Sequence, residues 1–149
     1  MFASSLAACA PGNPAPATSL ERSLAGLEQV PLTIRSSTGV HRFQVEVART
    51  PEEQAQGLMH RQALAPDRGM MFPYEPPQPV SFWMKDTFIS LDIIFIRADG
   101  TIVRIGADTV PLSLELVPSL EPVAAVLEIA GGRAAELGIR PGDRVDWPS

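Results

Sequence analysis

Residues 81–96 read Ser-Phe-Trp-Met-Lys-Asp-Thr-Phe-Ile-Ser-Leu-Asp-Ile-Ile-Phe-Ile, the densest apolar run of the chain. If residues 82–89 form a strand, alternate side chains point to opposite faces, and both faces carry bulky apolar groups. This pattern predicts a strand covered on both sides. The run also holds three charged residues, Lys85, Asp86 and Asp92. We expect each to lie at a strand end or to meet a partner, because a buried unpaired charge is costly.

The composition indicates one globular domain. The chain has 149 residues, of which 45% are hydrophobic and 19% are charged. Its 15 prolines and 11 glycines favour strands and turns over a helical bundle. The net charge of −5 and the scattered basic residues argue against nucleic acid as a partner. No segment has the run of about 18 apolar residues that a membrane-spanning helix needs.

The single cysteine, Cys9, follows Leu6-Ala7-Ala8, a pattern typical of a bacterial lipoprotein cleavage site. Only eight residues precede it and none is basic, so we interpret residues 1–9 as the remnant of a signal whose true start lies upstream. The alternative is a short tail with an accidental cysteine. Residues 10–29 are rich in proline and alanine and predict a flexible tether. We therefore expect an extracytoplasmic domain on the periplasmic face, held to the membrane only by a lipid on Cys9.

The rest of the chain, residues 30–149, predicts a single β domain. We expect strands over residues 30–36, 40–48, 101–107 and 123–130, a last strand ending near Val145, and short helices over residues 50–57 and 131–137. Thr50 is the expected N-cap of the first helix, with Pro51 in the first turn and Glu53 closing a capping box. The four prolines of residues 73–79 predict an exposed loop, and the apolar content of residues 111–122 predicts a loop packed along the body.

These elements predict a mainly β fold, an antiparallel sandwich with two short helices. Alternation of apolar residues does not by itself distinguish a sandwich from a barrel.

A set of motifs is similar to those of one known family. They are Gly57-Leu58-Met59, Gly69-Met70-Met71-Phe72, Phe82-Trp83-Met84-Lys85-Asp86-Thr87, Leu91-Asp92-Ile93, and Leu127-Glu128 with Gly131. Over residues 40–147 the chain resembles the domain of unknown function 192 family. It differs at Asp86, where the family more often has Asn, and at Ser90, where Pro is frequent. The resemblance implies a jelly-roll-like β-sandwich and no established reaction.

Five charged residues stand in apolar contexts and are the main site candidates: Arg61, Lys85, Asp86, Asp92 and Glu128. If they share a pocket, Lys85, Asp92 and Glu128 are the catalytic candidates, with a carboxyl as acid or base. The alternative is that they form ion pairs that hold loops to the sandwich. The complete predicted binding set is Met59, Arg61, Tyr74, Trp83, Lys85, Asp86 and Glu128.

Aromatic residues give a second hypothesis for the site. Tyr74, Phe82 and Trp83 lie near the proline-rich segment and suit a platform for a sugar ring or a peptide. The alternative is that Trp83 fills the core.

We expect no cofactor and no metal. The methionines and His60 suit cuprous ion chemically, but they form no Met-x-Met cluster, and methionine commonly fills cores. The two histidines, His41 and His60, lack the spacing of a zinc site. A phosphate-binding glycine loop, a nucleophile elbow and a Cys-His pair are also missing from the sequence.

Three functions remain open: a non-enzymatic module of the cell envelope that binds a ligand or a protein, a hydrolase or lyase acting on an envelope polymer, and an assembly protein without a small ligand. Unpaired Lys85, Asp92 and Glu128 converging in a cleft would favour catalysis. An aromatic floor without converging carboxylates would favour binding, and a closed core with every charge paired would favour assembly.

Overall fold

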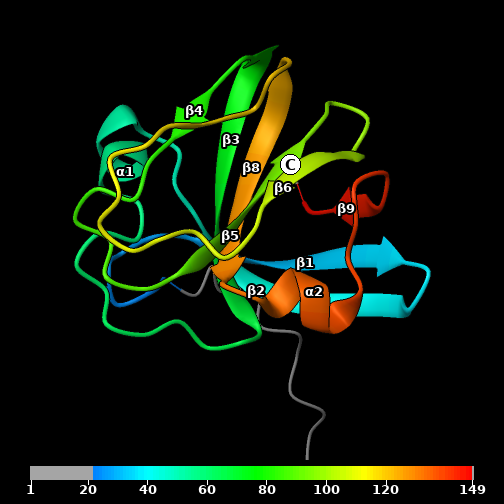
Figure 1. Ribbon diagram of the computed structural model, residues 1–149, viewed down its shortest axis with the longest axis horizontal. Helices are drawn as coiled ribbons and strands as arrows, with labels where there is room; N and C mark the ends of the chain where they lie inside the picture. Colours follow the sequence, from blue (N-terminus) through cyan, green and yellow to red (C-terminus); the bar gives the residue numbers. More distant parts are fainter. Residues whose placement is uncertain (1–21, 149) are drawn as a thin grey trace, which may run out of the picture.

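The computed structural model describes residues 22–148, so Cys9 and most of the predicted tether lie outside the described residues. Seven strands form one sheet, in the order β6-β5-β8-β3-β2-β1-β9 (Figure 1). Their bounds are β1 Gln29–Ser36, β2 Gly39–Val47, β3 Arg68–Gln78, β5 Leu91–Ile96, β6 Ile102–Gly106, β8 Val123–Ala130 and β9 Arg144–Asp146. Two short strands, β4 (Ser81–Phe82) and β7 (Val117–Pro118), pair separately, and the helices are α1 (Pro51–Gln56) and α2 (Arg133–Leu137). The prediction of a mainly β fold with two short helices is confirmed.

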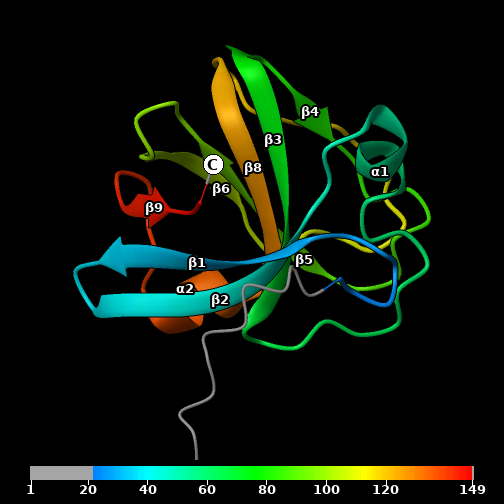
Figure 2. The same ribbon diagram turned by 180° about the vertical axis from the view of Figure 1, so that it is seen from behind.

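The seven-stranded sheet curls until its two outer strands approach each other. Neighbouring strands are antiparallel except β2 and β3, which are parallel and are connected through α1. At the ends of the sheet, Thr101 and Arg144 form an isolated bridge, and the Val145 N–H donates to the Gly100 carbonyl at 2.8 Å. Figures 1 and 2 show the resulting curved body from its two sides. The two opposed sheets of a jelly-roll sandwich are not confirmed.

The central strands are buried on both faces, because the curled sheet has an inner and an outer apolar layer. All six residues of β5 are buried. Ile94 and Ile96 belong to the inner cluster, which also contains residues of β1, β2 and β9. Ile93 and Phe95 belong to the outer cluster, together with Phe72 of β3. Alternate side chains of β5 therefore pack into two different apolar cores, whereas in a half-exposed strand one set would face solvent.

The strand predicted over residues 82–89 is wrong. The chain leaves β4 after Phe82 and turns, with the Thr87 N–H donating to the Met84 carbonyl at 3.1 Å. Trp83 and Phe88 are 44% and 48% exposed, and in this part of the run only Met84 reaches the outer cluster as a fully buried side chain. The polar Lys85-Asp86-Thr87 sequence favours the turn, and Asp86 adopts a φ of 51° there, a conformation that Asp tolerates better than most residues.

The proline-rich segment also differs from its prediction. Residues 73–78 are the irregular end of β3 instead of a loop, and the register to β8 shifts between Pro73 and Gln78. The shift follows from the prolines, which have no N–H to donate to the neighbouring strand. Residues 75–79 are exposed, as expected for such a segment.

The segment expected to pack along the body, residues 111–122, instead exposes its large apolar side chains. Leu112, Leu114, Leu116 and Leu120 are all exposed, and so is Val110 immediately before them. Ser119 is the buried residue of the segment, and its hydroxyl donates to the Glu121 carbonyl at 2.7 Å. The hydroxyl thus holds the backbone while the leucines point outward.

Local signals at the helix ends are confirmed. The Thr50 hydroxyl accepts a hydrogen bond from the Glu53 N–H at 3.1 Å, and the Glu53 carboxylate accepts one from the Thr50 N–H at 3.0 Å. This is the predicted capping box, with Pro51 in the first turn. Helix α2 ends at Gly138, which has a φ of 72° that favours glycine.

Asp92 connects β5 to two segments distant in sequence. Its side chain is fully buried, and its carboxylate accepts hydrogen bonds from the backbone N–H groups of Asp108, Gly132 and Ala134, at 2.9, 3.0 and 2.8 Å. The carboxylate thus joins the loop after β6 and the start of α2 to the centre of the sheet. Hydrogen bonds to a charged acceptor are among the stronger ones in proteins.

Replacing Asp92 by Asn should destabilise the protein by about 3 kcal/mol, because an amide N–H₂ would face buried N–H donors and the negative charge would be lost. Urea unfolding followed by circular dichroism measures the change in free energy. Glu52→Gln, on the exposed side of α1, is the matched control and should change it by less than about 0.5 kcal/mol. Equal stability of the two variants would contradict the assigned role of Asp92.

Candidate functional site

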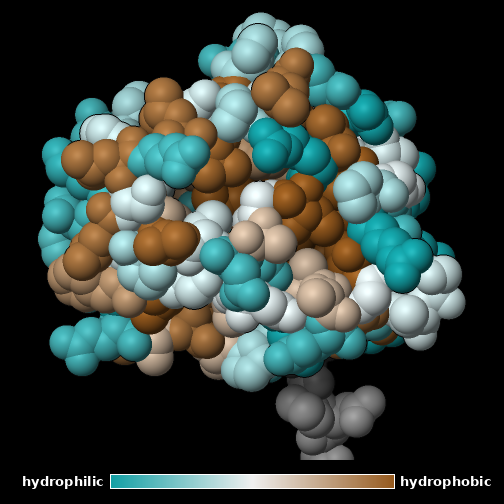
Figure 3. All heavy atoms as spheres, in the orientation of Figure 1, coloured by the Kyte–Doolittle hydropathy of each residue, from teal (hydrophilic) through white to brown (hydrophobic). Residues whose placement is uncertain are grey.

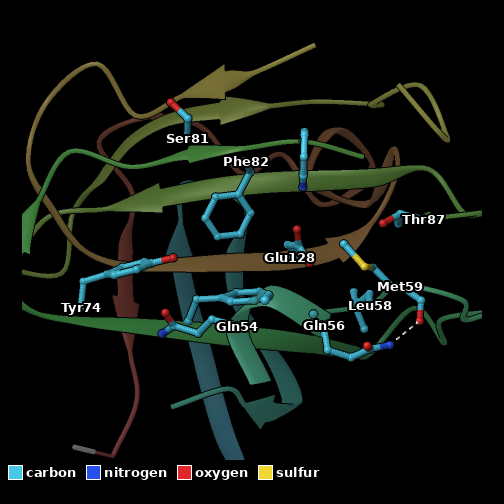
Figure 4. Close-up of a pocket in the computed structure, with 13 residues that line it drawn as sticks. Gln54, Gln56, Leu58, Met59, Tyr74, Ser81, Phe82, Thr87 and Glu128 are labelled. Atoms are coloured by element: carbon cyan, nitrogen blue, oxygen red, sulfur yellow. Dashed lines mark hydrogen bonds between the residues drawn. The ribbon is translucent and has the colours of Figure 1, made fainter. Parts of the chain in front are cut away.

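A cavity of about 220 Å³ lies on the outer face of the sheet (Figure 4). It is bounded by β3 and β8 below, by β4 and residues 83–87 on one side, and by the end of α1 on the other. Short and irregular segments thus cover this part of the outer core, and such a cover leaves more free space than a sheet or a long helix would. The volume lies below the range of about 300–1,000 Å³ that is typical of ligand pockets, so it suits only a small ligand or part of a larger one.

One wall of the cavity is apolar and largely aromatic. Phe72 and Phe82 pack edge to face, with ring centroids 5.0 Å apart. Leu58 and Met59 follow Gly57, where the chain turns out of α1 with a φ of 46°. A Cβ on Gly57 would lie 3.4 Å from the Phe72 ring, so both the backbone angle and the close approach favour glycine.

Glu128 of β8 is the only carboxyl group among the described residues that line the cavity. Its neighbours Leu127 and Ile129 point to the inner core, so alternation turns Glu128 to the outer face. Glu128 is 5% exposed, and no residue from 22 to 148 donates a hydrogen bond to its carboxyl group. Burial raises the pKa of this carboxyl from 4.5 to about 8. Near neutral pH the group is therefore mostly protonated and uncharged.

Tyr74 of β3 extends toward Glu128 along the cavity (Figure 4). Burial, and secondly the charge of Glu128, raise the pKa of the Tyr74 hydroxyl to about 12. Both groups are then neutral near pH 7, and each can donate one hydrogen bond and accept others. Gln54 adds a fixed amide, since its Nε2 donates to the carbonyls of Ala48 and Pro73 at 3.1 and 3.0 Å.

The structure brings together four residues of the predicted binding set and separates the rest. Met59, Tyr74, Trp83 and Glu128 line the cavity, whereas Arg61, Lys85 and Asp86 of that set, and the catalytic candidate Asp92, do not. The predicted convergence of Lys85, Asp92 and Glu128 is therefore not observed.

The four excluded residues have other surroundings. Arg61 forms a two-pronged ion pair with the buried Glu46, at 2.6 and 3.1 Å. Lys85 is exposed, with its Nζ 5.4 Å from the centre of the Trp83 ring. The Asp86 carbonyl accepts the His60 N–H at 2.8 Å, and Asp92 makes the three backbone contacts described above.

Sequence reasoning missed several lining residues, among them Gln54, Gln56, Phe72 and Thr87. The two glutamines lie on a short polar helix, which in sequence looks like any solvated surface. Phe72 looks like an ordinary core residue. A signal that could have found them is Gly57, whose positive φ favours glycine and which brings the end of α1 against β3.

Residues 22–148 show no group of three or more His, Cys, Asp or Glu side chains able to hold a metal ion. Within the same range, no helix is long and apolar enough to cross a membrane.

Both the sequence and the fold of this chain are similar to those of known proteins. The family model of DUF192, described as "Uncharacterized ACR", matches residues 32–147. The chain belongs to the DUF192 family. This confirms the resemblance read from the sequence motifs. No curated protein matches the chain.

Two solved structures are similar to this DUF192 chain. A protein of unknown function from Novosphingobium aromaticivorans is 47% identical, with a TM-score of 0.83, over 85% of this chain and 90% of that one. A proposed transcription regulator from Sinorhizobium meliloti is 41% identical, with a TM-score of 0.79, over 81% of this chain and 95% of that one.

The Glu128 carboxyl should make the stability of the protein depend on pH. Its pKa is about 8 in the folded protein and 4.5 as its ordinary value. Between these values the folded state holds the proton more tightly than the unfolded state does. The stabilisation is complete below about pH 4.5 and is lost as the pH rises through about 8, by up to about 1.4 kcal/mol per unit. Urea unfolding at pH 5, 7 and 9 measures the slope.

Glu128→Gln should remove the contribution of Glu128 to the pH dependence of the unfolding free energy. The substitution Glu52→Gln, at an exposed position, should retain that contribution. Parallel slopes for Glu128→Gln and the unsubstituted protein would show that Glu128 ionises normally.

Proposed function

We propose that this chain is a non-enzymatic binding module of the cell envelope that takes a small uncharged molecule in the Glu128 cavity. The observation that carries the proposal is a buried carboxyl, without a hydrogen-bonding partner among residues 22–148, at the floor of a cavity with aromatic walls. Residues 22–148 contain no fully enclosed side-chain nitrogen or oxygen that lacks a hydrogen-bonding partner, so the Glu128 oxygens open onto the cavity, where a ligand can form hydrogen bonds with them.

The chemistry of the cavity favours a neutral ligand with both an apolar face and hydrogen-bonding groups. Phe72, Phe82 and Trp83 offer ring surfaces, while Tyr74 and Glu128 offer one donor each and further acceptors. An anionic ligand is disfavoured for two reasons. Its charge would oppose the ionisation of Glu128, and the protein itself carries a net charge of −5. A sugar ring or a small amide combines the required features.

The envelope location rests on the sequence alone. The support for it is the Leu6-Ala7-Ala8-Cys9 pattern followed by a proline- and alanine-rich stretch. A lipid on Cys9 would hold the binding module at the membrane surface.

A hydrolase or lyase acting on an envelope polymer is the second candidate, because a carboxyl with a pKa of about 8 is suited to act as a general acid. Against it, the second carboxyl that glycoside hydrolysis commonly uses is missing from the described lining residues, and Asp92 is occupied by three backbone N–H groups. An assembly role without a small ligand is disfavoured by the presence of the cavity.

A panel of uncharged sugars and amides, including N-acetylglucosamine, tests the proposal through thermal shift and tryptophan fluorescence. A ligand from the panel should bind the unsubstituted protein below pH 8 and lose affinity as Glu128 ionises. Glu128→Gln keeps a donor and an acceptor and should keep the affinity within about threefold, without the pH dependence. Glu128→Leu should weaken binding at least about tenfold, the cost of about one hydrogen bond to a buried group.

Glu115→Gln, an exposed acid on another segment, is the matched control and should bind normally. Affinity for a panel member that increases above pH 8 would show that the ionised carboxylate binds the ligand better than the neutral carboxyl does, and would contradict the proposal. Product formation from the same panel that disappears in Glu128→Gln would favour the enzyme.

A further inference from the structure

The loop between β6 and β8 turns its apolar side chains outward. Val110, Leu112, Leu114 and Leu116 occur at every second position, and with Leu120 they are between 56% and 76% exposed. Alternation of this kind normally directs the apolar side to the core. Here the leucines face solvent, and the Ser113 and Ser119 hydroxyls form hydrogen bonds with the backbone at Glu115 and Glu121.

A second loop extends this apolar surface. The Met84 N–H donates to the Ser113 carbonyl at 2.9 Å, and the Leu112 N–H donates to the Thr87 carbonyl at 3.0 Å. These bonds join the backbones of the two loops, and the residues that flank Met84 and Thr87 in sequence, Trp83 and Phe88, are also exposed. We call the combined surface the leucine rim; it consists of Trp83, Phe88, Val110, Leu112, Leu114, Leu116 and Leu120.

The figures place the loop on one side of the molecule. Residues 107–120, yellow in Figures 1 and 2, run along the side that carries α1 and β4. Figure 3 shows apolar residues breaking the hydrophilic surface on that side. Isolated exposed leucines are common on soluble proteins, but a group of this size marks a contact surface.

The composition of the rim fits a lipid surface better than a protein partner. Glu115 is the only charged residue from 109 to 120. Leucines that project singly can insert among acyl chains without a complementary pocket. Lys85 lies over the Trp83 ring at 5.4 Å, and a tryptophan beside a lysine is a typical pair at the boundary between hydrocarbon and water.

The length of chain that precedes the described residues also favours contact between the rim and a lipid bilayer. Fully extended, the chain from Cys9 to Arg22 reaches at most about 45 Å. A lipid on Cys9 would therefore keep the domain close to a bilayer, where even a weak second contact becomes effective.

We propose that the leucine rim is a membrane-contact surface, inserted into the interfacial region of a lipid bilayer. The rim shares Trp83 with the wall of the Glu128 cavity, but the proposal does not depend on a ligand in that cavity.

The test uses the full chain with Cys9→Ser, so that binding to vesicles reports the rim and not the anchor. Trp147→Phe leaves Trp83 as the only tryptophan of the chain. With vesicles of phosphatidylcholine, alone or mixed with phosphatidylglycerol, we expect co-flotation, a blue shift of Trp83 emission, and quenching of Trp83 by brominated lipid. Leu114→Ser combined with Leu116→Ser should lower the partition coefficient at least about tenfold, without a change in the unfolding midpoint.

Val40→Ser is the matched control, because Val40 is also half-exposed but lies on β2, outside the rim. It should leave the partition coefficient unchanged. The proposal is overturned if the parent protein does not bind either vesicle type, or if Val40→Ser lowers binding as much as the double substitution does. A dimer in sedimentation that the double substitution dissociates, with no vesicle binding, would assign the rim to a second copy and also overturn it.

Discussion

Burial of the central strands on both faces is the constraint on which this structure depends. β3, β5 and β8 supply one set of side chains to the interior of the curl and another to the outer layer. The inner set is enclosed by the sheet itself, whereas the outer set needs a separate cover. Here the cover is α1, the β4–β7 pair and two irregular loops. The two candidate surfaces of the protein both follow from that cover.

The cover accounts for the cavity as well as for the exposed leucines. Helix α1 has only six residues and ends at Gly57, so it leaves a gap above Phe72 and Glu128. The loops close the remaining side through backbone hydrogen bonds, which need no particular side chains. Their own apolar residues are thus free to point away from the core. A regular element in the same place would have used those residues for packing.

Much of the fold could be predicted from sequence because its signals are local. The Thr50–Glu53 capping box, the hairpin around Gly39 and the strand that carries Glu128 are each specified by residues close in sequence. The prediction of a strand over residues 82–89 was wrong because the apolar residues around Lys85-Asp86-Thr87 were given more weight than this polar turn sequence. The sequence identified Glu128 because it is an isolated charge among apolar residues. It did not show that Glu128 and Asp92 point to opposite faces of the sheet, or that α2 supplies a backbone N–H to Asp92.

The meeting of β6 and β9 has a consequence for how the chain folds. β9 pairs with β1, and the residue before β6 forms a bridge with β9, so the curl closes only when the last strand is in place. On a ribosome, residues 144–146 leave the exit tunnel after all eight of the preceding described strands have emerged. The hairpin of β1 and β2 must then wait for a partner more than a hundred residues later in the sequence. Until residues 144–146 have emerged and paired with β1, the interior of the curl is not closed by β9 and is accessible to water and to chaperones.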